Sequence, residues 1–351
     1  MKVLFLTSGA QAPATRFRVL QYVPHLRALG HRCTVAHSVP QKYDYWPALG
    51  WRPSQWIKRG VRFWHLARAA TGAYDVVFVE RELFNDGTWS MEARFRRVAR
   101  AMVLDVDDAV FLEHPGKLER IAPMCDAVIA GNRFLKDRIA PYQPNVEIIP
   151  TCVDMDRYPP RNIAEHGGRR TVIGWMGTAS NLNNLGVVAP VLRRLASRYD
   201  FELQIVTGKD APLASLDLGG LSTTVLRWDA QREVEQLHAF DVGMMPLRMD
   251  REWDLYKCGT KLIQYMAVGT PGVASPVGVN AEIVRHGENG FLAATAEEWE
   301  EHLGKLLQDP ELRRRLGEAA RRRIAAAYSV QVWLPYFVEV FGRATTVSRP
   351  P

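Results

Sequence analysis

Short apolar runs alternate with amphipathic segments along most of this chain, and this alternation constrains the fold more than any other feature. The first run, Lys2–Thr7, ends at Ser8 and Gly9, which is typical of a buried parallel strand. The segment Arg16–Leu29 carries apolar residues at helical spacing, and Gly30 is placed to end that helix. Further strands are predicted at Cys33–Ser38, Asp75–Glu80, Ala101–Val106, Asp126–Gly131 and Val146–Thr151. Strands that alternate with helices predict right-handed βαβ units in a doubly wound parallel sheet.

A second series of strands and helices begins after Tyr158–Arg170, which is rich in proline, glycine and charge and is predicted to be a linker. The first strand of this series is predicted at Thr171–Gly177. The later strands are predicted at Phe201–Gly208, Thr223–Trp228, Val242–Leu247 and Gly272–Ser275, with helices near Leu185–Arg198, Gln231–Phe240 and Gly259–Val268. A chain of 351 residues is long enough for two such domains. The sequence therefore predicts an α/β protein with two Rossmann-like domains and a ligand cleft between them.

Composition excludes several classes of protein. With 47% hydrophobic residues and a net charge of +7, the chain is not a low-complexity disordered protein. No run of about 18 apolar residues predicts a transmembrane helix, and Met1–Leu6 is too short for the core of a signal peptide. Neither series carries GxGxxG after its first strand, which argues against a nicotinamide or flavin dehydrogenase. The four cysteines form no CxxC pair and the nine histidines show no zinc spacing, so we expect a cytoplasmic protein without a metal site.

Two segments concentrate positive charge. Arg313–Arg315 and Arg321–Arg323 lie on a predicted helix without interleaved aromatic residues, which favours a solvated helix face over a nucleic-acid partner. The segment 45–68 combines five cations with the four tryptophans Trp46, Trp51, Trp56 and Trp64. A packed helix whose cations reach past it to water is the favoured interpretation. The alternative is peripheral contact with the inner face of a membrane, which suits tryptophan beside cations.

Several motifs together resemble one enzyme family. The segment Lys257–Asn280 (KCGTKLIQYMAVGTPGVASPVGVN) is similar to the nucleotide-sugar-binding motif of retaining GT-B glycosyltransferases of the family 4, or group 1, type. Its KCxxKLIQYMA core resembles a recurrent KCxxKLLQYMA subgroup. Further similarity lies in Ala14–His31, Leu104–Phe111, Cys125–Leu135, Ile148–Tyr158 and Gly287–Phe291, in the family's order.

The resemblance implies a domain plan and a reaction. It implies an acceptor-binding domain over residues 1–160, a nucleotide-sugar-binding domain over 161–328, and a C-terminal helix over 329–351 that returns to the first domain. It also implies retaining transfer of a sugar from a nucleotide diphosphate sugar to a hydroxyl acceptor without metal or cofactor. The acceptor would be a glycan, a lipid-linked intermediate of bacterial envelope polysaccharide synthesis, or a secondary metabolite. A non-catalytic sugar-nucleotide-binding protein and a GT-B nucleotide-sugar 2-epimerase remain alternatives.

The resemblance also implies donor-binding residues, with two departures from the family. Gln264 stands where relatives carry the glutamate that binds the ribose hydroxyls, and an amide can still make such a bond. Tyr256 stands where relatives carry a second glutamate, for which Glu252 or Asp254 could substitute. The remaining expected contacts to the donor come from Gly9, Arg16, Arg18, Gly177, Thr178, Trp228, Lys257 and Lys261. Because the segment after Thr171–Gly177 has no cation, the lysines, the arginines and a helix N-terminus would hold the diphosphate.

Carboxylates at the end of Ala101–Val106 are the candidate catalytic groups on the other domain. Asp107 stands where relatives carry a histidine near the donor sugar, and Asp108 follows it. The resemblance implies that both act at the sugar, with Lys261 as the third catalytic residue. The alternative for Asp108 is helix capping, and core packing is the alternative to base stacking for Trp228.

Overall fold

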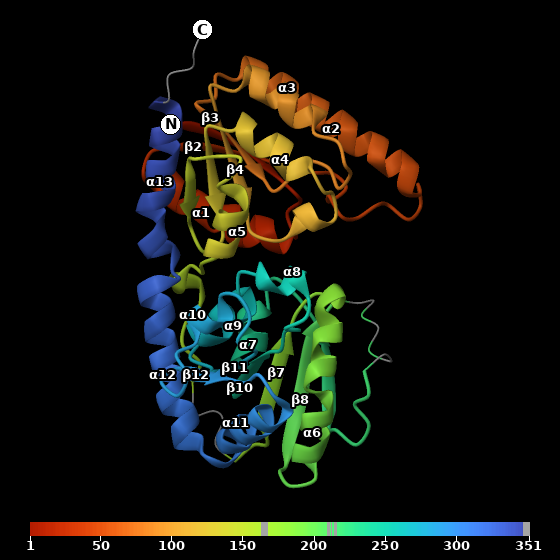
Figure 1. The fold of residues 1–351 in the computed structure, drawn as a ribbon, viewed down its shortest axis with the longest axis vertical. Coiled ribbons are helices and arrows are strands. Elements are labelled where there is room, and N and C mark those ends of the chain that lie inside the picture. The colour runs from red at the N-terminus through yellow and green to blue at the C-terminus, as the bar shows by residue number, and fades with distance from the viewer. Residues whose placement is uncertain (163–167, 209–210, 212, 214–215, 347–351) are drawn as a thin grey trace. The chain divides into compact units, whose positions relative to one another are not determined.

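The protein is described here by a computed structural model that covers residues 1–162, 168–208, 211, 213 and 216–346 (Figure 1). The chain divides into two compact units. Unit 1 comprises Met1–Cys152 together with the chain from Trp333 onward, and unit 2 comprises Val153–Val332. The predicted linker Tyr158–Arg170 thus begins inside unit 2, and its residues 163–167 lie outside the described residues.

Unit 1 is built on a six-stranded parallel sheet whose strand order is β2-β1-β3-β4-β5-β6. The strands are β1 (Lys2–Thr7), β2 (Arg32–His37), β3 (Val76–Glu80), β4 (Ala101–Val106), β5 (Ala127–Ala130) and β6 (Val146–Ile148). They are rich in valine, isoleucine and leucine because most of them are covered on both faces. From β1 the chain first adds β2 on one side and then crosses to add β3 on the other side. The order in which strands are added therefore reverses between β1 and β3. Ligands of doubly wound proteins gather at the carboxyl ends of strands at such a point.

The helices of unit 1 are α1 (Tyr22–Ala28), α2 (Trp51–Thr71), α3 (Ser90–Val98), α4 (Lys117–Ile121), α5 (Arg133–Ile139) and α13 (Val330–Thr346), the last of which begins in unit 2. The single helix predicted over Arg16–Leu29 is wrong, because a π-helical segment, Thr15–Leu20, precedes α1. Pro24 accounts for the break: it has no N–H to donate to the carbonyl of Leu20, and its ring crowds that carbonyl.

Helix α13 contributes to the core of unit 1 from the other end of the sequence. The Phe337 ring stacks on Tyr22 at a centroid distance of 4.5 Å, and it also packs against Phe78 of β3 at 5.7 Å. Phe341 lies 6.2 Å from Phe5 of β1. The sheet of unit 1 therefore uses aromatic side chains that arrive last in the sequence.

Unit 2 repeats the plan with the strand order β12-β11-β10-β7-β8-β9. Its strands are β7 (Thr171–Met176), β8 (Phe201–Thr207), β9 (Thr223–Arg227), β10 (Val242–Met245), β11 (Gly272–Ala274) and β12 (Gly290–Leu292). Its helices are α6 (Ala189–Ala196), α7 (Glu233–His238), α8 (Glu252–Leu255), α9 (Thr260–Ala267), α10 (Asn280–Ile283), α11 (Ala296–Gln308) and α12 (Pro310–Ala327). Here the strand order reverses between β7 and β10, so the carboxyl end of β7 is the expected ligand position.

Glycines let side chains pack closely against this second sheet. A Cβ at Gly243 of β10 would lie 2.4 Å from Cδ2 of Tyr265, and one at Gly174 of β7 would lie 2.0 Å from the Phe240 ring. Tyr265 belongs to α9, so the glycine in β10 sets how near α9 lies to the strands. None of the described helices combines the length and apolar character that crossing a bilayer requires.

Candidate functional site

A buried glutamate stands at the carboxyl end of β3 in unit 1, at the point where the sheet reverses. Glu80 accepts hydrogen bonds from the Thr15 hydroxyl at 2.6 Å and from the Ser8 backbone N–H at 3.4 Å. Burial raises the pKa of Glu80 above its ordinary value. The neighbouring Gly9 has φ +144°, and a Cβ there would lie 2.5 Å from Cγ of Gln41. Gly9 therefore allows two loops to approach each other at this end of the sheet.

Arg18 is engaged inside unit 1, which corrects its predicted role as a phosphate ligand. Its Nε and Nη2 donate to the Asp105 carboxylate at 3.0 Å and 2.6 Å, and its Nη1 donates to the Ile149 carbonyl at 2.8 Å. The Arg18 side chain is 1% exposed and that of Asp105 is fully buried. A phosphate contact would require this bidentate ion pair to break. Arg16, by contrast, is half-buried, with its guanidinium 5.2 Å from the Phe17 ring.

Arg81 holds the two candidate catalytic aspartates, a role that no sequence motif indicates. Its Nε donates to Oδ1 of Asp107, and its Nη2 lies 3.6 Å from Oδ2 of Asp108. Burial alone would raise the pKa of Asp107, but the cations around it, Arg81 first and then Arg18 and Lys42, together hold that pKa below its ordinary value. Asp107 is therefore a carboxylate at neutral pH. Asp108 also accepts a hydrogen bond from the Ala109 N–H at 2.9 Å, at the start of the 3-10 turn Val110–Leu112.

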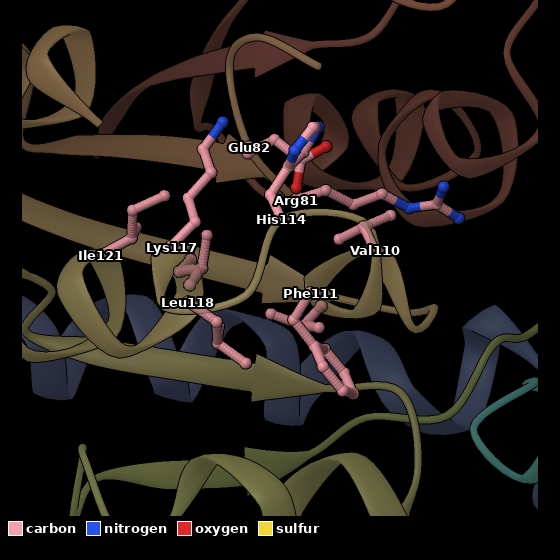
Figure 2. A pocket seen from close by; sticks show the side chains of 10 residues that line it. Arg81, Glu82, Val110, Phe111, His114, Lys117, Leu118 and Ile121 are labelled. Carbon is pink, nitrogen blue, oxygen red and sulfur yellow. The ribbon is translucent and has the colours of Figure 1, made fainter. Parts of the chain in front are cut away.

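The cavity beside Arg81 is too small for a substrate. Its volume is about 20 Å³, which is room for about one water molecule. Figure 2 shows the Arg81 guanidinium extending away from Lys117, whose ammonium donates to the carbonyls of Phe84 and Asp86 at 2.6 Å and 2.7 Å. The remaining lining includes Glu82, Phe111 and His114. This cavity belongs to the packing of unit 1.

A larger groove opens near Gly9, and we call it the aromatic groove. Its volume is about 680 Å³. It is lined by Ala10, Gln11, His37, Ser38, Val39, Pro40, Gln41, Tyr43, Asp44, Tyr45, Trp46 and Pro47. Within it the Gln41 amide donates to the Asp44 carboxylate at 2.8 Å. The groove thus combines exposed ring faces with amide and carboxylate groups.

The surface of α2 corrects the favoured interpretation of segment 45–68. The cations Lys58 and Arg62 are buried, whereas Trp56 is 71% exposed and Trp64 is 60% exposed. Arg62 donates to the carbonyl of Thr7 at 2.7 Å, at the end of β1. Lys58 donates to the carbonyl of Lys42 at 2.7 Å. The inward cations bind carbonyl groups, and the aromatic side chains face solvent.

In unit 2, Lys261 and Gly177 lie together at the carboxyl end of β7. Lys261, on α9, places its ammonium 5.8 Å from the centroid of the Trp175 ring. A Cβ at Gly177 would lie 2.7 Å from Cε of Lys261, so glycine leaves room for the lysine side chain. Thr178 follows, and its hydroxyl accepts a hydrogen bond from Asn181 at 2.8 Å. The helix predicted to open here is a 3-10 helix, Ala179–Val187, which precedes α6.

Lys257 is held beside this segment by an ion pair. Its ammonium lies 2.8 Å from Asp254 and donates to the Asn181 side chain at 2.6 Å. Asp254 is fully buried and also accepts from the Arg248 N–H at 3.0 Å, so it does not present a carboxylate in place of Tyr256. Lys257, Asn181 and Thr178 form one connected polar group.

Gln264 and Trp228 are joined by two residues that sequence reasoning missed. The Gln264 amide donates to the Tyr158 hydroxyl at 3.2 Å, and that hydroxyl donates to Oε2 of Glu233 at 3.1 Å. The Trp228 indole N–H donates to Oε1 of the same glutamate at 3.0 Å. Gln264, Tyr158 and Glu233 are buried, and Trp228 is half-buried. We call these four residues the Gln264 relay.

Solved structures show which architecture this is. Sucrose-phosphate synthase from Thermosynechococcus elongatus matches with a TM-score of 0.75 over 99% of this chain and 100% of that chain, at 15% identity. Anabaena Alr3699/HepE in complex with UDP-glucose matches with a TM-score of 0.70 over 97% of this chain and 99% of that chain, at 16% identity. The chain therefore has the α/β architecture of GT-B proteins, which confirms the predicted fold class.

Sequence comparisons agree with the motifs. Residues 170–309 match the family model described as Glycosyl transferases group 1. Over 212 residues the chain is 28% identical to MMP α-(1→4)-mannosyltransferase from Mycolicibacterium hassiacum, covering 57% of this chain and about half of that relative, 48%. Over 316 residues it is 24% identical to D-inositol 3-phosphate glycosyltransferase from Corynebacterium jeikeium, covering 82% of this chain and 70% of that one. The resemblance to group 1 glycosyltransferases is confirmed.

Proposed function

We propose that the protein is a retaining glycosyltransferase that moves a sugar from a nucleotide diphosphate sugar to a hydroxyl acceptor. The observation that carries this proposal is the placement of Lys261 beside Gly177 at the carboxyl end of β7, with Gln264 further along the same helix, α9. All three lie in the segment that matches the group 1 glycosyltransferase model. The solved structure of Alr3699/HepE with UDP-glucose supports a donor of this class.

The proposed chemistry rests on stabilising the diphosphate as it leaves. The bond between the anomeric carbon and the diphosphate oxygen breaks, the acceptor oxygen bonds to the same face of that carbon, and the acceptor proton passes to a diphosphate oxygen. Lys261, Lys257 and the backbone N–H groups after Thr178 supply positive charge for this step. Asp107 and Asp108, fixed by Arg81, bind sugar hydroxyls. Since these charges come from the protein, we propose that no metal or cofactor takes part.

We propose that the acceptor is a saccharide bound in the aromatic groove of unit 1. Ring faces of Tyr43, Tyr45 and Trp46 suit the apolar face of a sugar, and the Gln41 and Asp44 side chains suit its hydroxyls. A volume of about 680 Å³ falls in the range of small-molecule sites. This combination favours a glycan or a glycosylated lipid over a small metabolite.

We also propose that α2 contacts the inner face of a membrane. Its outward tryptophans and its lack of any acidic residue suit an anionic lipid surface. An exposed face of large aromatic side chains on a monomer is a candidate interaction surface. A lipid-linked acceptor would then be bound next to the membrane that carries it.

A thermal-shift screen with UDP-, GDP-, dTDP- and ADP-sugars tests donor binding. A donor at about 100 times its Kd stabilises the folded protein by about 2.7 kcal/mol, which raises the melting temperature by several degrees. Lys261→Ala should reduce that shift strongly, because the variant lacks the ammonium group that faces the diphosphate. Lys305→Ala, which removes an exposed lysine of α11, is the matched control.

Product analysis then separates the alternatives. Retention appears as the same anomeric configuration in donor and product, measured by NMR. A donor shift that persists in Lys261→Ala contradicts the phosphate role. A 2-epimer formed without acceptor would identify an epimerase, and donor binding with no transfer to any acceptor would identify a binding protein.

A further inference from the structure

The Gln264 relay joins two helices and two connecting segments of unit 2 by three hydrogen bonds. Gln264 lies on α9, Tyr158 precedes β7, Glu233 begins α7 and Trp228 follows β9. Arg321 of α12 donates to the backbone carbonyls of both Tyr158 and Ala267. Because Ala267 ends α9, this arginine fixes the distance between Tyr158 and the helix that carries Gln264.

Every hydrogen bond of the relay is donated toward Glu233. The Trp228 indole is only a donor, so Oε1 of Glu233 accepts from it. Oε2 of Glu233 faces the Tyr158 hydroxyl, whose single proton goes to that carboxylate. The same hydroxyl can then only accept from residue 264. The NH₂ group of Gln264 satisfies this requirement, and a carboxylate at position 264 would not, because it has no proton to donate.

We infer that Tyr158 and Glu233 are positioning residues that require an amide at position 264 and fix its orientation. With its NH₂ group on Tyr158, Gln264 turns its carbonyl oxygen Oε1 to the opposite side of the amide group. This oxygen accepts a hydrogen bond from a ribose hydroxyl of the donor, a step that rests on the proposed function. The carboxylate of the relay is that of Glu233.

Each single substitution disturbs the relay in a different way. In Gln264→Glu, two carboxylates face one phenol proton, and one of them loses its hydrogen bond. In Glu233→Gln, the new amide accepts from Trp228 through its oxygen and therefore turns its NH₂ group toward Tyr158. The phenol proton then points to Gln264, whose amide must flip to accept it. The flip leaves an NH₂ group where the ribose contact needs an oxygen.

The amide at position 264 and the carboxylate at position 233 can be exchanged without losing any hydrogen bond of the relay. In the double variant Glu233→Gln/Gln264→Glu, the amide at position 233 accepts from Trp228 and donates to Tyr158. The phenol in turn donates to the carboxylate at position 264. Every bond of the relay is then restored with its direction reversed at Tyr158, and the second carboxylate oxygen is available to the ribose.

A double-mutant cycle in urea tests the proton direction without any ligand. We expect Gln264→Glu to lower the unfolding midpoint, and the addition of Glu233→Gln to recover most of that loss. Losses that add in the double variant would overturn the inference. Gln308→Glu is the matched control: its amide also donates to a tyrosine hydroxyl, that of Tyr199, but at an exposed position. It should leave the midpoint near that of the wild type.

Nucleotide affinity tests the positioning role, with the probe chosen as the tightest binder among UDP, GDP and ADP by calorimetry. Glu233→Gln should weaken binding about tenfold, the cost of one lost hydrogen bond to the ribose, whereas Gln264→Glu keeps a carboxylate oxygen for the ribose and should weaken binding less. The double variant should return to within about threefold of the wild type. A Glu233→Gln variant that binds as tightly as the wild type would overturn the ribose contact. No binding by the wild type would overturn both that contact and the proposed function, while the urea cycle would still decide the proton direction.

Discussion

Arg81 shows how much a single residue organises at the end of β3. Its backbone has φ +58°, a left-handed conformation that residues other than glycine rarely adopt. Its N–H donates to the carbonyl of Asp105 at 2.7 Å, and its guanidinium pairs with Asp107 and Asp108. The strained backbone therefore aims one cation at two carboxylates that follow the neighbouring strand β4.

Arg81→Gln should destabilise the protein by about 3 kcal/mol at pH 7, the cost of leaving a mostly buried carboxylate without its cation. The effect should depend on pH. Because the pKa of Asp107 is lower in the folded than in the unfolded protein, its contribution to stability is complete above the unfolded pKa of about 4. It is lost as the pH falls through the lower folded value. Urea unfolding from pH 7 to about pH 3 measures both effects.

In Arg81→Gln this acid-dependent loss should be absent, so the stability difference between variant and wild type should narrow below about pH 4. A constant difference across the pH range would contradict the ion pair as its cause. Turnover of the donor, measured on the same variant, should fall as well if Asp107 acts at the sugar.

At the scale of elements, strands are easier to predict than the orientation of helices. Lys2–Thr7 and Ala101–Val106 have the predicted bounds, because a buried parallel strand is marked by its own apolar residues. The orientation of α2 cannot be predicted in this way. Its inward face binds carbonyls of Thr7 and Lys42, and nothing in the composition of α2 shows where those carbonyls lie.

The aromatic face of α2 should bind anionic vesicles. Replacing Trp56, Phe63 and Trp64 together by serine should lower partitioning by at least about tenfold, because each aromatic side chain buried in the interface contributes on the order of 1.5 kcal/mol or more. Cosedimentation with vesicles of phosphatidylcholine and phosphatidylglycerol measures the partition coefficient. Tyr336→Ser, at an exposed aromatic residue on α13, is the control. Equal partitioning of the triple variant and the wild type would exclude α2 as the contact.

At the scale of the whole molecule, the two units differ in how the chain builds them. Unit 2 is one continuous segment, whereas unit 1 takes its core from both ends of the chain. Phe337 is fully buried between Tyr22 and Phe78, far from both in sequence. Unit 1 is therefore complete only when α13 is in place.

Phe337→Ala should cost about 3–5 kcal/mol, as expected for an aromatic side chain removed from a core, and the loss should be confined to unit 1. Hydrogen exchange followed by mass spectrometry should show faster exchange in peptides from β1 and β3. Peptides from β8 and β10 should keep their wild-type rates. Equal acceleration in both units would mean that they unfold together.

Some residues of the candidate site can be predicted from the sequence, and others cannot. A motif predicts Lys261 and a strand end predicts Gly177, and the structure brings the two into contact. The prediction for Arg18 fails because its partner Asp105 is 87 residues away, and sequence pattern does not reveal such a pairing. Tyr158 and Glu233 could not be predicted for the same reason. Neither belongs to a motif, and their role depends on the hydrogen bond that the Tyr158 hydroxyl donates to Glu233.

The place of α13 has a consequence for how this protein is made. A ribosome releases all six strands of unit 1 early, but their last aromatic partners emerge only after the whole of Val153–Val332 has been translated. The nascent chain therefore presents an apolar seam around Phe5 and Phe78 during most of its synthesis. Unit 2, which is one continuous segment, can therefore finish folding before the unit that precedes it.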